Sequence, residues 1–498
     1  MKHKPFYEKF TKSRRDTFRS SPMPSKQSTE LCNAPQNTSH GTMYIVPSGT
    51  PCSRVPSDPL FGVLHTPVLG AVHSPVLGAV RSENRSEKRR HTKTMPPIKP
   101  EEYEYGTPVF SPLTAQTKKI LDAFPAILQR VLPLNDKHMQ KLPLHIHTLF
   151  HELTDERSRR KIHYMNDPLK LSAYMHYYLW WNLVRMVKLL QNIPIDLPDS
   201  AVAADFGSGP LTFLCALWIA KPVLRKKKLK WYCVDLSHKA LSLGEELFLA
   251  LCAYTATADS CAYTPWEIKK VTGAFGCKLK EKAVLITESN MFNEIFWDTP
   301  LSMELLAKKT YHTLARYLQP KGSVLLIEPG IPLAGAFFSL LRTHLLKNGF
   351  FISSPCPHAR SCAFPYSRTL SAALKWCHFT FETDDSPQNL RRLSEAAHLG
   401  KERASLSFLY CTQPPSRTQA VSTAAYISVR ICSDILNLPV RKIGRYACSE
   451  YGFLLLCSAD IPTGSLHTAV SGTLLLVPRS RFLLDKKDKK TGAWIVEL

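Results

Sequence analysis

The sequence predicts an α/β protein built around a doubly wound, Rossmann-like sheet, and three observations predict this class. Residues 201–206 form a short apolar run with Asp205 near its end, which is typical of a buried parallel strand. A glycine turn, Gly207-Ser208-Gly209, follows at once and leads into an apolar, helix-like segment. Residues 229–235 form a second such run that ends in Asp235, and strand-like and helix-like segments alternate up to residue 350. Strand, glycine turn and helix in this order are typical of a nucleotide-binding corner.

The glycine turn also indicates which ligand the corner binds. A dinucleotide fingerprint needs a third glycine, and Thr212 occupies that position, which disfavours NAD. An acid before a short Gly-x-Gly turn is more typical of S-adenosylmethionine (SAM) methyltransferases, and Asp235 would accept hydrogen bonds from the ribose hydroxyls. We therefore predict a SAM site at Asp205, Gly207, Gly209 and Asp235. The alternative is an empty or degenerate pocket, because Leu211 stands where methyltransferases commonly have another glycine.

Composition points to an anionic partner. Lys and Arg number 64 against 40 Asp and Glu, a formal net charge of +24, which favours RNA. No apolar run reaches the roughly 18 residues of a membrane span. The 14 cysteines, with no secretion signal, predict reduced thiols or metal ligands rather than disulfides. The basic, Ser-rich start weakly favours a transit peptide, although Pro5, Glu8 and Asp16 do not fit one.

Before the predicted sheet, the chain divides into two parts. Residues 1–104 are rich in Pro, Ser, Arg and Lys and contain a tandem repeat, HTPVLGAV and HSPVLGAV, so a disordered basic tail is expected. Residues 105–196 show helical periodicity. Asp167 precedes Pro168 as a natural helix start. We expect the aromatic side chains of Tyr177, Trp180 and Trp181 to be core rather than platforms for bases.

Within residues 197–350, Pro210 is expected at the first position of the helix that follows the glycine turn. The further elements predicted here are helices at 239–254, 303–318 and 333–347 and strands at 283–287 and 323–327. Asn290, Asn293 and Glu294 follow the strand at 283–287. Because ligands bind at the carboxyl ends of such strands, Asn290 joins the predicted cofactor site, with simple loop capping as the alternative.

Residues 351–419 are rich in cysteine. Cys356, Cys362 and Cys377 have the spacing C-x5-C-x14-C, which does not match the C-x2-C knuckles of structural zinc. It suits an iron–sulfur cluster better, with a distant fourth thiolate. Zinc with His358 or His378, and a Pro355-Cys356 nucleophile of an RNA cytosine methyltransferase, are the alternatives. The downstream candidates for the fourth ligand are Cys411, Cys432, Cys448 and Cys457.

Residues 420–498 predict a small β-rich module, with strands at 425–431, 451–457, 473–477 and 494–496. Its basic side chains, Arg441, Lys442, Arg445 and the lysine-rich stretch 486–490, are expected to contact RNA phosphates.

Several motifs together resemble the methyltransferase-like assembly factors of the small ribosomal subunit, known from mitochondria and bacteria. The matching pieces are YMNDP, AYMHYYL, DFGSGP, VDLS, NMFNE, EPG, SPCPH, WCHF and KERASLSFLY, across roughly residues 105–460. The combination of CPH, a further cysteine and WCHF is the most specific. The resemblance implies a Rossmann-like class I methyltransferase core with an N-terminal helical region, a Cys-rich iron–sulfur insertion and a C-terminal β-rich module.

The resemblance also implies cofactors and partners. It implies a 4Fe-4S cluster on Cys356, Cys362, Cys377 and a fourth cysteine, for which Cys448 fits best and Cys432 remains possible. The implied function is that of a SAM-dependent methyltransferase-like protein that binds small-subunit rRNA and its precursor particle during assembly. The alternative is an inactive iron–sulfur RNA-binding scaffold, since some members have lost catalysis, and no catalytic residue is identified. A monomer in the bacterial cytoplasm is expected, with the mitochondrial matrix as the alternative.

Overall fold

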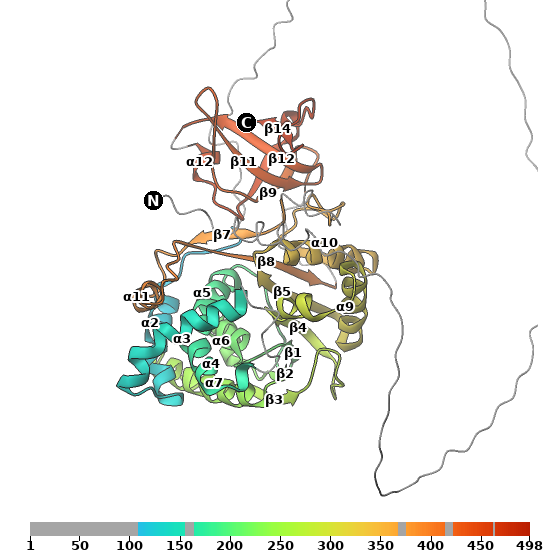
Figure 1. Ribbon diagram of the computed structural model, residues 1–498. Coiled ribbons are helices and arrows are strands. Elements are labelled where there is room, and N and C mark those ends of the chain that lie inside the picture. The colour runs from blue at the N-terminus through green and yellow to red at the C-terminus, as the bar shows by residue number, and fades with distance from the viewer. Residues whose placement is uncertain (1–107, 155–163, 367–374, 414–421, 462–463) are drawn as a thin grey trace, which may run out of the picture. The chain divides into compact units, whose positions relative to one another are not determined.

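The computed structural model describes residues 108–154, 164–366, 375–413, 422–461 and 464–498 (Figure 1). The predicted tail at 1–104, with its repeat, lies outside the described residues.

A mixed eight-stranded sheet is the centre of the fold and confirms the predicted Rossmann-like α/β class. Its order is β3-β2-β1-β4-β5-β8-β6, with β7 paired to β8. The strands are β1 (Val202–Phe206), β2 (Lys230–Asp235), β3 (Glu267–Thr272), β4 (Ala283–Ser289), β5 (Leu318–Pro329), β6 (Phe351–Ser354), β7 (Phe379–Glu382) and β8 (Arg403–Thr412). The first five pair in parallel, whereas β8 runs antiparallel to β5, β6 and β7. The order 3-2-1-4-5 is that of a doubly wound sheet.

Helices cover both faces of this sheet, as Figure 1 shows. One face packs against α2 (Ala115–Val131), α5 (Leu179–Leu190), α6 (Thr212–Ala220) and α7 (His238–Ala258), and the other against α8 (Phe292–Asp298), α9 (Met303–Tyr317) and α10 (Pro332–Lys347). Successive strand residues alternate between the two cores: Ala203 lies in the first and Ala204 in the second. Two buried faces explain why these strands read as continuous apolar runs.

The N-terminal region is helical, as predicted. It also contains α3 (Asp136–Thr154), α4 (Pro168–Ala173) and a single π-helical turn, Tyr174–Tyr178, that leads into α5. Asp167 caps α4 with its side chain, which accepts hydrogen bonds from the backbone of Leu169 and Lys170. Trp180 and Trp181 are 3% and 2% exposed, which confirms their prediction as core.

Two predictions around the central strands were wrong. Pro210 does not begin a helix: the backbone of Leu211 is left-handed, with a φ of 57°, so α6 begins only at Thr212. The strand predicted at 323–327 starts earlier, because residues 318–322 also belong to β5; Lys321 there takes a φ of 65°, and the register with β4 shifts between Ala283 and Leu285. Strand β3 was not anticipated, because this edge strand is polar and mostly exposed.

Beyond residue 350 the chain returns to the same sheet. Strand β8 inserts between β5 and β6 in the sheet. In sequence, the part of the chain that carries Cys356, Cys362 and Cys377 lies between two strands of this sheet, β6 and β7. A helix, α11 (Gln388–Ala396), lies between β7 and β8. The three cysteines are therefore attached to the core at both ends of their segment.

The C-terminal residues form a second, six-stranded sheet of order β13-β9-β11-β12-β14, with β10 paired to β11. Its elements are β9 (Tyr426–Ile431), β10 (Leu436–Leu438), β11 (Lys442–Ser449), β12 (Gly452–Ala459), α12 (Ser465–Thr468), β13 (Leu474–Pro478) and β14 (Trp494–Glu497). Four of these strands match the predicted ones. Strand β11 was missed because Gly444 and Arg445 interrupt its apolar pattern. Among the described residues, no helix is both long and apolar enough to cross a bilayer.

Candidate functional site

The turn between β1 and α6 forms a backbone cradle. Gly207 and Gly209 both have left-handed backbones, with φ of 66° and 48°. A β-carbon added to Gly209 would meet nothing within 4 Å, so space is open on that side of the turn. A β-carbon on Gly207 would lie 2.6 Å from the Cβ of Met291, so this glycine permits a close approach of the loop after β4. Gly209 therefore leaves space open beside the turn, whereas Gly207 makes room for Met291.

Asp235, at the end of β2, holds this cradle. One carboxylate oxygen accepts a hydrogen bond from the backbone N–H of Gly209 at 2.8 Å, and the other accepts one from Ser237 at 2.8 Å. The hydroxyl of Ser237 donates to Asn166 at 2.7 Å, which ties the YMNDP segment to the same edge of the sheet. Burial raises the pKa of Asp235 and outweighs these backbone donors.

Asp205 lies at the carboxyl end of β1 and is fully buried. Its Oδ1 accepts a hydrogen bond from Thr287 at 2.6 Å, whereas Oδ2 has no hydrogen-bond partner. Burial raises the pKa of Asp205 to about 7, although the hydrogen bond from Thr287 lowers it. The hydroxyl of Ser208 donates to the backbone carbonyl of Asp205 at 2.8 Å. In this buried position Asp205 supports the glycine turn.

The loop after β4 meets the cradle from the other side. Asn290 takes a left-handed backbone, with a φ of 64°, and its side-chain oxygen accepts a hydrogen bond from Arg185 at 3.2 Å. The loop is held by two buried glutamates: Glu288 accepts from the backbone of Met291 at 2.6 Å, and Glu328 accepts from Phe292 at 2.8 Å. Burial raises the pKa of both glutamates. Two such carboxyls held together favour sharing a proton.

Sequence reasoning missed a polar group on the π-helical turn and α5. Arg185 donates to Asn182 at 2.6 Å, and Asn182 donates to the hydroxyl of Tyr174 at 3.4 Å. Tyr174 stacks on Tyr178, and its pKa is raised by burial and by the nearby charge of Glu294. π-Helical turns are frequent at functional sites, but helical periodicity gives no sign of them. The group links α5 to the predicted residue Asn290.

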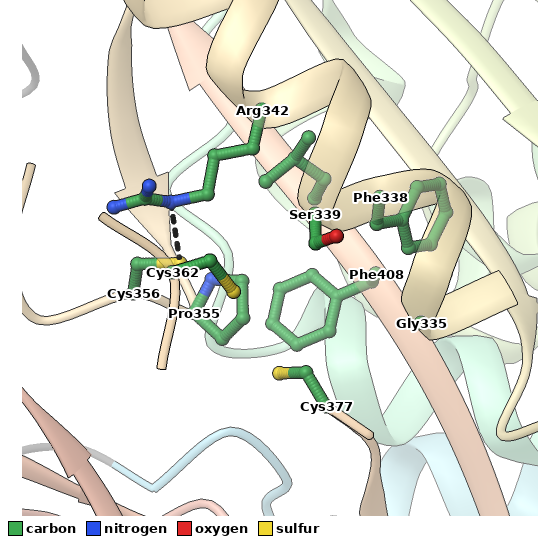
Figure 2. A pocket seen from close by; sticks show the side chains of 10 residues that line it. Gly335, Phe338, Ser339, Arg342, Pro355, Cys356, Cys362, Cys377 and Phe408 are labelled. Atoms are coloured by element: carbon green, nitrogen blue, oxygen red, sulfur yellow. Dashed lines mark hydrogen bonds between the residues drawn. The ribbon is translucent and has the colours of Figure 1, made fainter. Parts of the chain in front are cut away.

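A second site lies between α10, the segment after β6, and β8. Cys356, Cys362 and Cys377 line one partly open pocket, together with side chains of α10 and β8 (Figure 2). Gly335 on α10 permits this arrangement, because a β-carbon there would lie 2.8 Å from the Cβ of Trp376. The indole of Trp376 donates to the carbonyl of Gly330 at 3.0 Å, and Ser407 donates to the carbonyl of Cys377 at 2.7 Å. The fold thus brings these three predicted cysteines together.

Two strands of the C-terminal module add thiols to this site. Cys432 follows β9 and Cys448 lies in β11, and the thiols of Cys432 and Cys448 are close enough to Cys356 and Cys362 to interact electrostatically. Burial raises the pKa of Cys362 to about 11 and of Cys432 to about 12, and raises the pKa of Cys377 and Cys448 well above the usual range. Without a bound cation these thiols would stay protonated.

The other candidate ligands differ in whether they lie near the thiols. His358 Nε2 lies 3.3 Å from Cys448 Sγ, and burial, with the charge of Arg342, lowers the pKa of His358 to about 4, so its ring is neutral. The ring of His378 stacks on Trp376. Cys411 is buried in β8, and its thiol is near Cys356. The charged neighbours of Cys457 are Glu497, Lys442 and Asp488, and none of the other thiols is among the groups that act on it.

Within the ranges that the structure describes, no three or more His, Cys, Asp or Glu side chains are arranged to hold a metal ion. Cys356, Cys362 and Cys377 instead line a small pocket with space of about 20 Å³, enough for about one water-sized sphere. Soft thiolate donors in this number suit zinc or an iron–sulfur cluster rather than magnesium or calcium.

The predicted RNA-contacting residues do not all lie at the surface. Arg445 is only 6% exposed, and its guanidinium donates to the carbonyls of Leu466, Ser433 and His467. Its prediction as a phosphate contact was wrong, because these bonds hold it inside the module. Arg441 is exposed and Lys442 is half-buried and paired with Glu497, while the lysines at 486, 487, 489 and 490 are exposed.

Two comparisons with known protein sequences gave different results. The model of a protein family described as mitochondrial small ribosomal subunit Rsm22 matches residues 183–434, just over half of the chain. No curated protein sequence matches the chain.

Solved structures of methyltransferases resemble the chain distantly. A Streptococcus mutans protein assigned to the SAM-dependent methyltransferases has 10% identity and a TM-score of 0.27, over 46% of this chain and 48% of that one. The chain therefore spans about half the length of that structure. A Listeria monocytogenes protein assigned to class I of these enzymes has 12% identity and a TM-score of 0.27, over 62% and 91%. A Pyrococcus furiosus methyltransferase has 13% identity and a TM-score of 0.22, over 43% and 77%. Likenesses this distant carry no inference about ligand or substrate.

Proposed function

Since the chain belongs to the mitochondrial small ribosomal subunit Rsm22 family, we propose that it is a SAM-dependent methyltransferase-like protein that acts in small-subunit assembly and binds small-subunit rRNA. The observation that carries the proposal is the family match across the Rossmann-like core and the cysteine-rich segment, residues 183–434.

The SAM part of the proposal is supported by the corner between β1 and β2. The open space beside Gly209 and the carboxylate of Asp235 stand at the carboxyl ends of adjacent parallel strands, where doubly wound sheets bind their ligands. The backbone of the turn would receive the amino-acid end of SAM, and Asp235 would accept from the ribose hydroxyls. Asn290 would line the pocket from the loop after β4. When bound, SAM supplies an electrophilic methyl group.

A specific observation favours the second candidate, an inactive scaffold. Met291 packs directly on Gly207, and Leu211 occupies a left-handed position where a glycine would be unstrained. Both oxygens of Asp235 already accept backbone hydrogen bonds. Met291 limits the space beside Gly207, Leu211 adds backbone strain, and the two backbone bonds use part of the acceptor capacity of Asp235. These features support a protein that keeps the fold and the ribosomal partner without methyl transfer.

The cofactor of the second site would be a 4Fe-4S cluster on Cys356, Cys362, Cys377 and Cys448, with Cys432 as the alternative fourth ligand. The support is the donor set: three thiols of the core line one pocket, and the thiols of Cys448 and Cys432 are near enough to interact with them electrostatically. Such a cluster would tie the Rossmann-like core to the C-terminal module, and its binding energy would be part of the folding energy.

The partner and location follow from the family and the charge. A formal net charge of +24 favours binding to rRNA and its precursor particle, with Arg441 and the exposed lysines after residue 485 as contacts. The family's description supports the mitochondrial matrix rather than the bacterial cytoplasm. We keep a monomer as the proposed state.

The proposal is tested by gradient sedimentation of the full chain with small-subunit precursor particles, with radiolabelled SAM present. Co-migration at low salt supports an assembly factor, and protein that stays at the top of the gradient contradicts it. Label transferred to the particle identifies an enzyme, whereas co-migration without transfer identifies the scaffold.

A further inference from the structure

A buried arginine contacts a sulfur of the cysteine cavity. Arg342 lies on α10, and its side chain reaches from that helix to the segment after β6 (Figure 2). Its Nε is 3.2 Å from Cys356 Sγ, and its terminal nitrogen donates to the carbonyl of His358 at 2.7 Å. The residue is 2% exposed. In the described part of the chain, no carboxylate forms an ion pair with it.

This environment is unfavourable unless the site carries negative charge. An arginine keeps its proton under all ordinary conditions, so burial cannot be relieved by neutralising it. A buried charge is costly without an opposite one, and a neutral thiol is a weak hydrogen-bond acceptor. Thiolates bound to a metal centre would provide both the negative charge and a better acceptor.

Other buried arginines in the chain are arranged differently. Arg225 is 1% exposed, but it forms an ion pair with Asp259 at 2.7 Å. Arg430, which also lies near the thiols, donates to the carbonyls of Pro355 and Gly472 at 2.9 and 2.8 Å. Arg342 therefore differs from Arg225 in having a sulfur where that residue has a carboxylate.

We propose that Arg342 is a positioning residue for the thiolate centre: it supplies a counter-charge, hydrogen-bonds the sulfur of Cys356, and thereby favours the reduced state of the cluster. This rests on the iron–sulfur centre of the proposed function. Reduction adds one electron to the cluster, and a fixed positive charge and hydrogen bonds to its sulfurs make that extra negative charge easier to hold. No proton transfer is needed, because arginine stays charged in both states.

The same guanidinium also arranges the link to the C-terminal module. By holding the carbonyl of His358, Arg342 orients the residue whose ring reaches Cys448 in β11. One side chain on α10 thus fixes a cysteine of the core and the histidine that contacts the module.

The test uses full-length protein, purified anaerobically and reconstituted with iron and sulfide, as wild type, Arg342→Gln, Arg342→Lys and Arg225→Gln. The measurements are iron and sulfide content and a redox titration followed by electron paramagnetic resonance. We expect Arg342→Gln to shift the one-electron equilibrium at least tenfold toward the oxidised cluster, about 59 mV. Arg342→Lys keeps the charge but loses the planar fork, so it should shift in the same direction by less. Arg225→Gln removes a buried arginine that does not line the cysteine pocket and should keep the wild-type potential.

The outcomes are distinguishable. A folded Arg342→Gln protein that loses iron also supports the proposal, because the centre then needs its counter-charge. Wild-type potential and iron content in Arg342→Gln overturn the proposal and leave the iron–sulfur centre standing. If Arg342→Gln does not fold, Arg342→Lys decides, and a wild-type potential there overturns the proposed hydrogen bond. A wild-type protein without iron overturns both this inference and the proposed centre.

Discussion

The carboxylate of Asp235 and the backbone N–H of Gly209 are joined by a 2.8 Å hydrogen bond that connects the ends of β2 and β1. This bond sets the shape of the glycine turn before any ligand arrives. Asp235 should therefore contribute to SAM binding in two ways: it orders the turn, and it would accept hydrogen bonds from the ribose hydroxyls.

We therefore expect Asp235→Ala to weaken SAM binding by at least tenfold, about 1.4 kcal/mol, through the loss of a charge-assisted hydrogen bond and of the ordered turn. Isothermal titration calorimetry of the full chain measures this. The matched control is Asp196→Ala, which removes an exposed acid paired with Lys227. Wild-type protein that gives no heat at millimolar SAM would favour the scaffold, and equal affinities in wild type and Asp235→Ala would remove Asp235 from the site.

The stability of the protein should fall as pH rises because of Asp205. Its pKa in the folded state is about 7, against 3.8 for an unperturbed carboxyl. Between these values the folded state binds the extra proton, so the free energy of unfolding decreases with pH, by up to about 1.4 kcal/mol per unit. Asp205→Asn stays neutral and keeps an acceptor for Thr287, so its advantage over wild type should grow from pH 4 to pH 7.

Urea unfolding at several pH values checks this, with Asp196→Asn as an exposed control. A stability difference between Asp205→Asn and wild type that does not change with pH would show that Asp205 does not titrate in this range.

Much of the core could be predicted from the sequence because its strands are buried on both faces. The runs that became β1, β2 and β4 are apolar almost throughout, and that pattern needs no knowledge of partners. Strand β3 is polar, and β11 is interrupted by Gly444 and Arg445, so neither has the expected pattern. The insertion of β8 between β5 and β6 is a long-range pairing, which a local sequence pattern cannot predict.

The site was predicted unevenly for a similar reason. Motif spacing identified Asp235, Gly209 and the three cysteines that share one cavity. It did not identify Arg342, because an arginine in an apolar helix shows no partner in sequence. It also gave Arg445 a role at the surface, since local sequence cannot show that three carbonyls surround its guanidinium.

The fourth ligand of the proposed cluster can be assigned by substitution. We expect Cys448→Ser to lose most of the iron, because Cys448 contacts His358, whereas the thiol of Cys432 donates to the carbonyl of Arg430 at 3.2 Å. We expect Cys432→Ser to keep the iron. Iron and sulfide analysis of the two variants, purified side by side, measures this. The reverse pattern would make Cys432 the ligand.

RNA-binding and unfolding measurements should distinguish the roles of Arg441 and Arg445 in the C-terminal module. Arg441→Gln removes an exposed charge, so affinity should fall and the slope of log affinity against log salt should decrease by about one. Arg445→Gln instead removes the hydrogen bonds of a buried guanidinium and should cost about 3 kcal/mol of stability. Filter binding at several salt concentrations and urea unfolding provide the two readouts. A smaller salt slope for Arg445→Gln, with unchanged stability, would contradict its buried role.

The central claim is that the cysteines of the core and of the C-terminal module hold one iron–sulfur cluster between them. The most direct test is the iron, zinc and acid-labile sulfide content of the full-length protein after anaerobic purification, with Cys377→Ser beside it. The account predicts about four irons and four sulfides per chain, with both lost in the variant. One zinc without sulfide, or no metal in the wild-type protein, would contradict it.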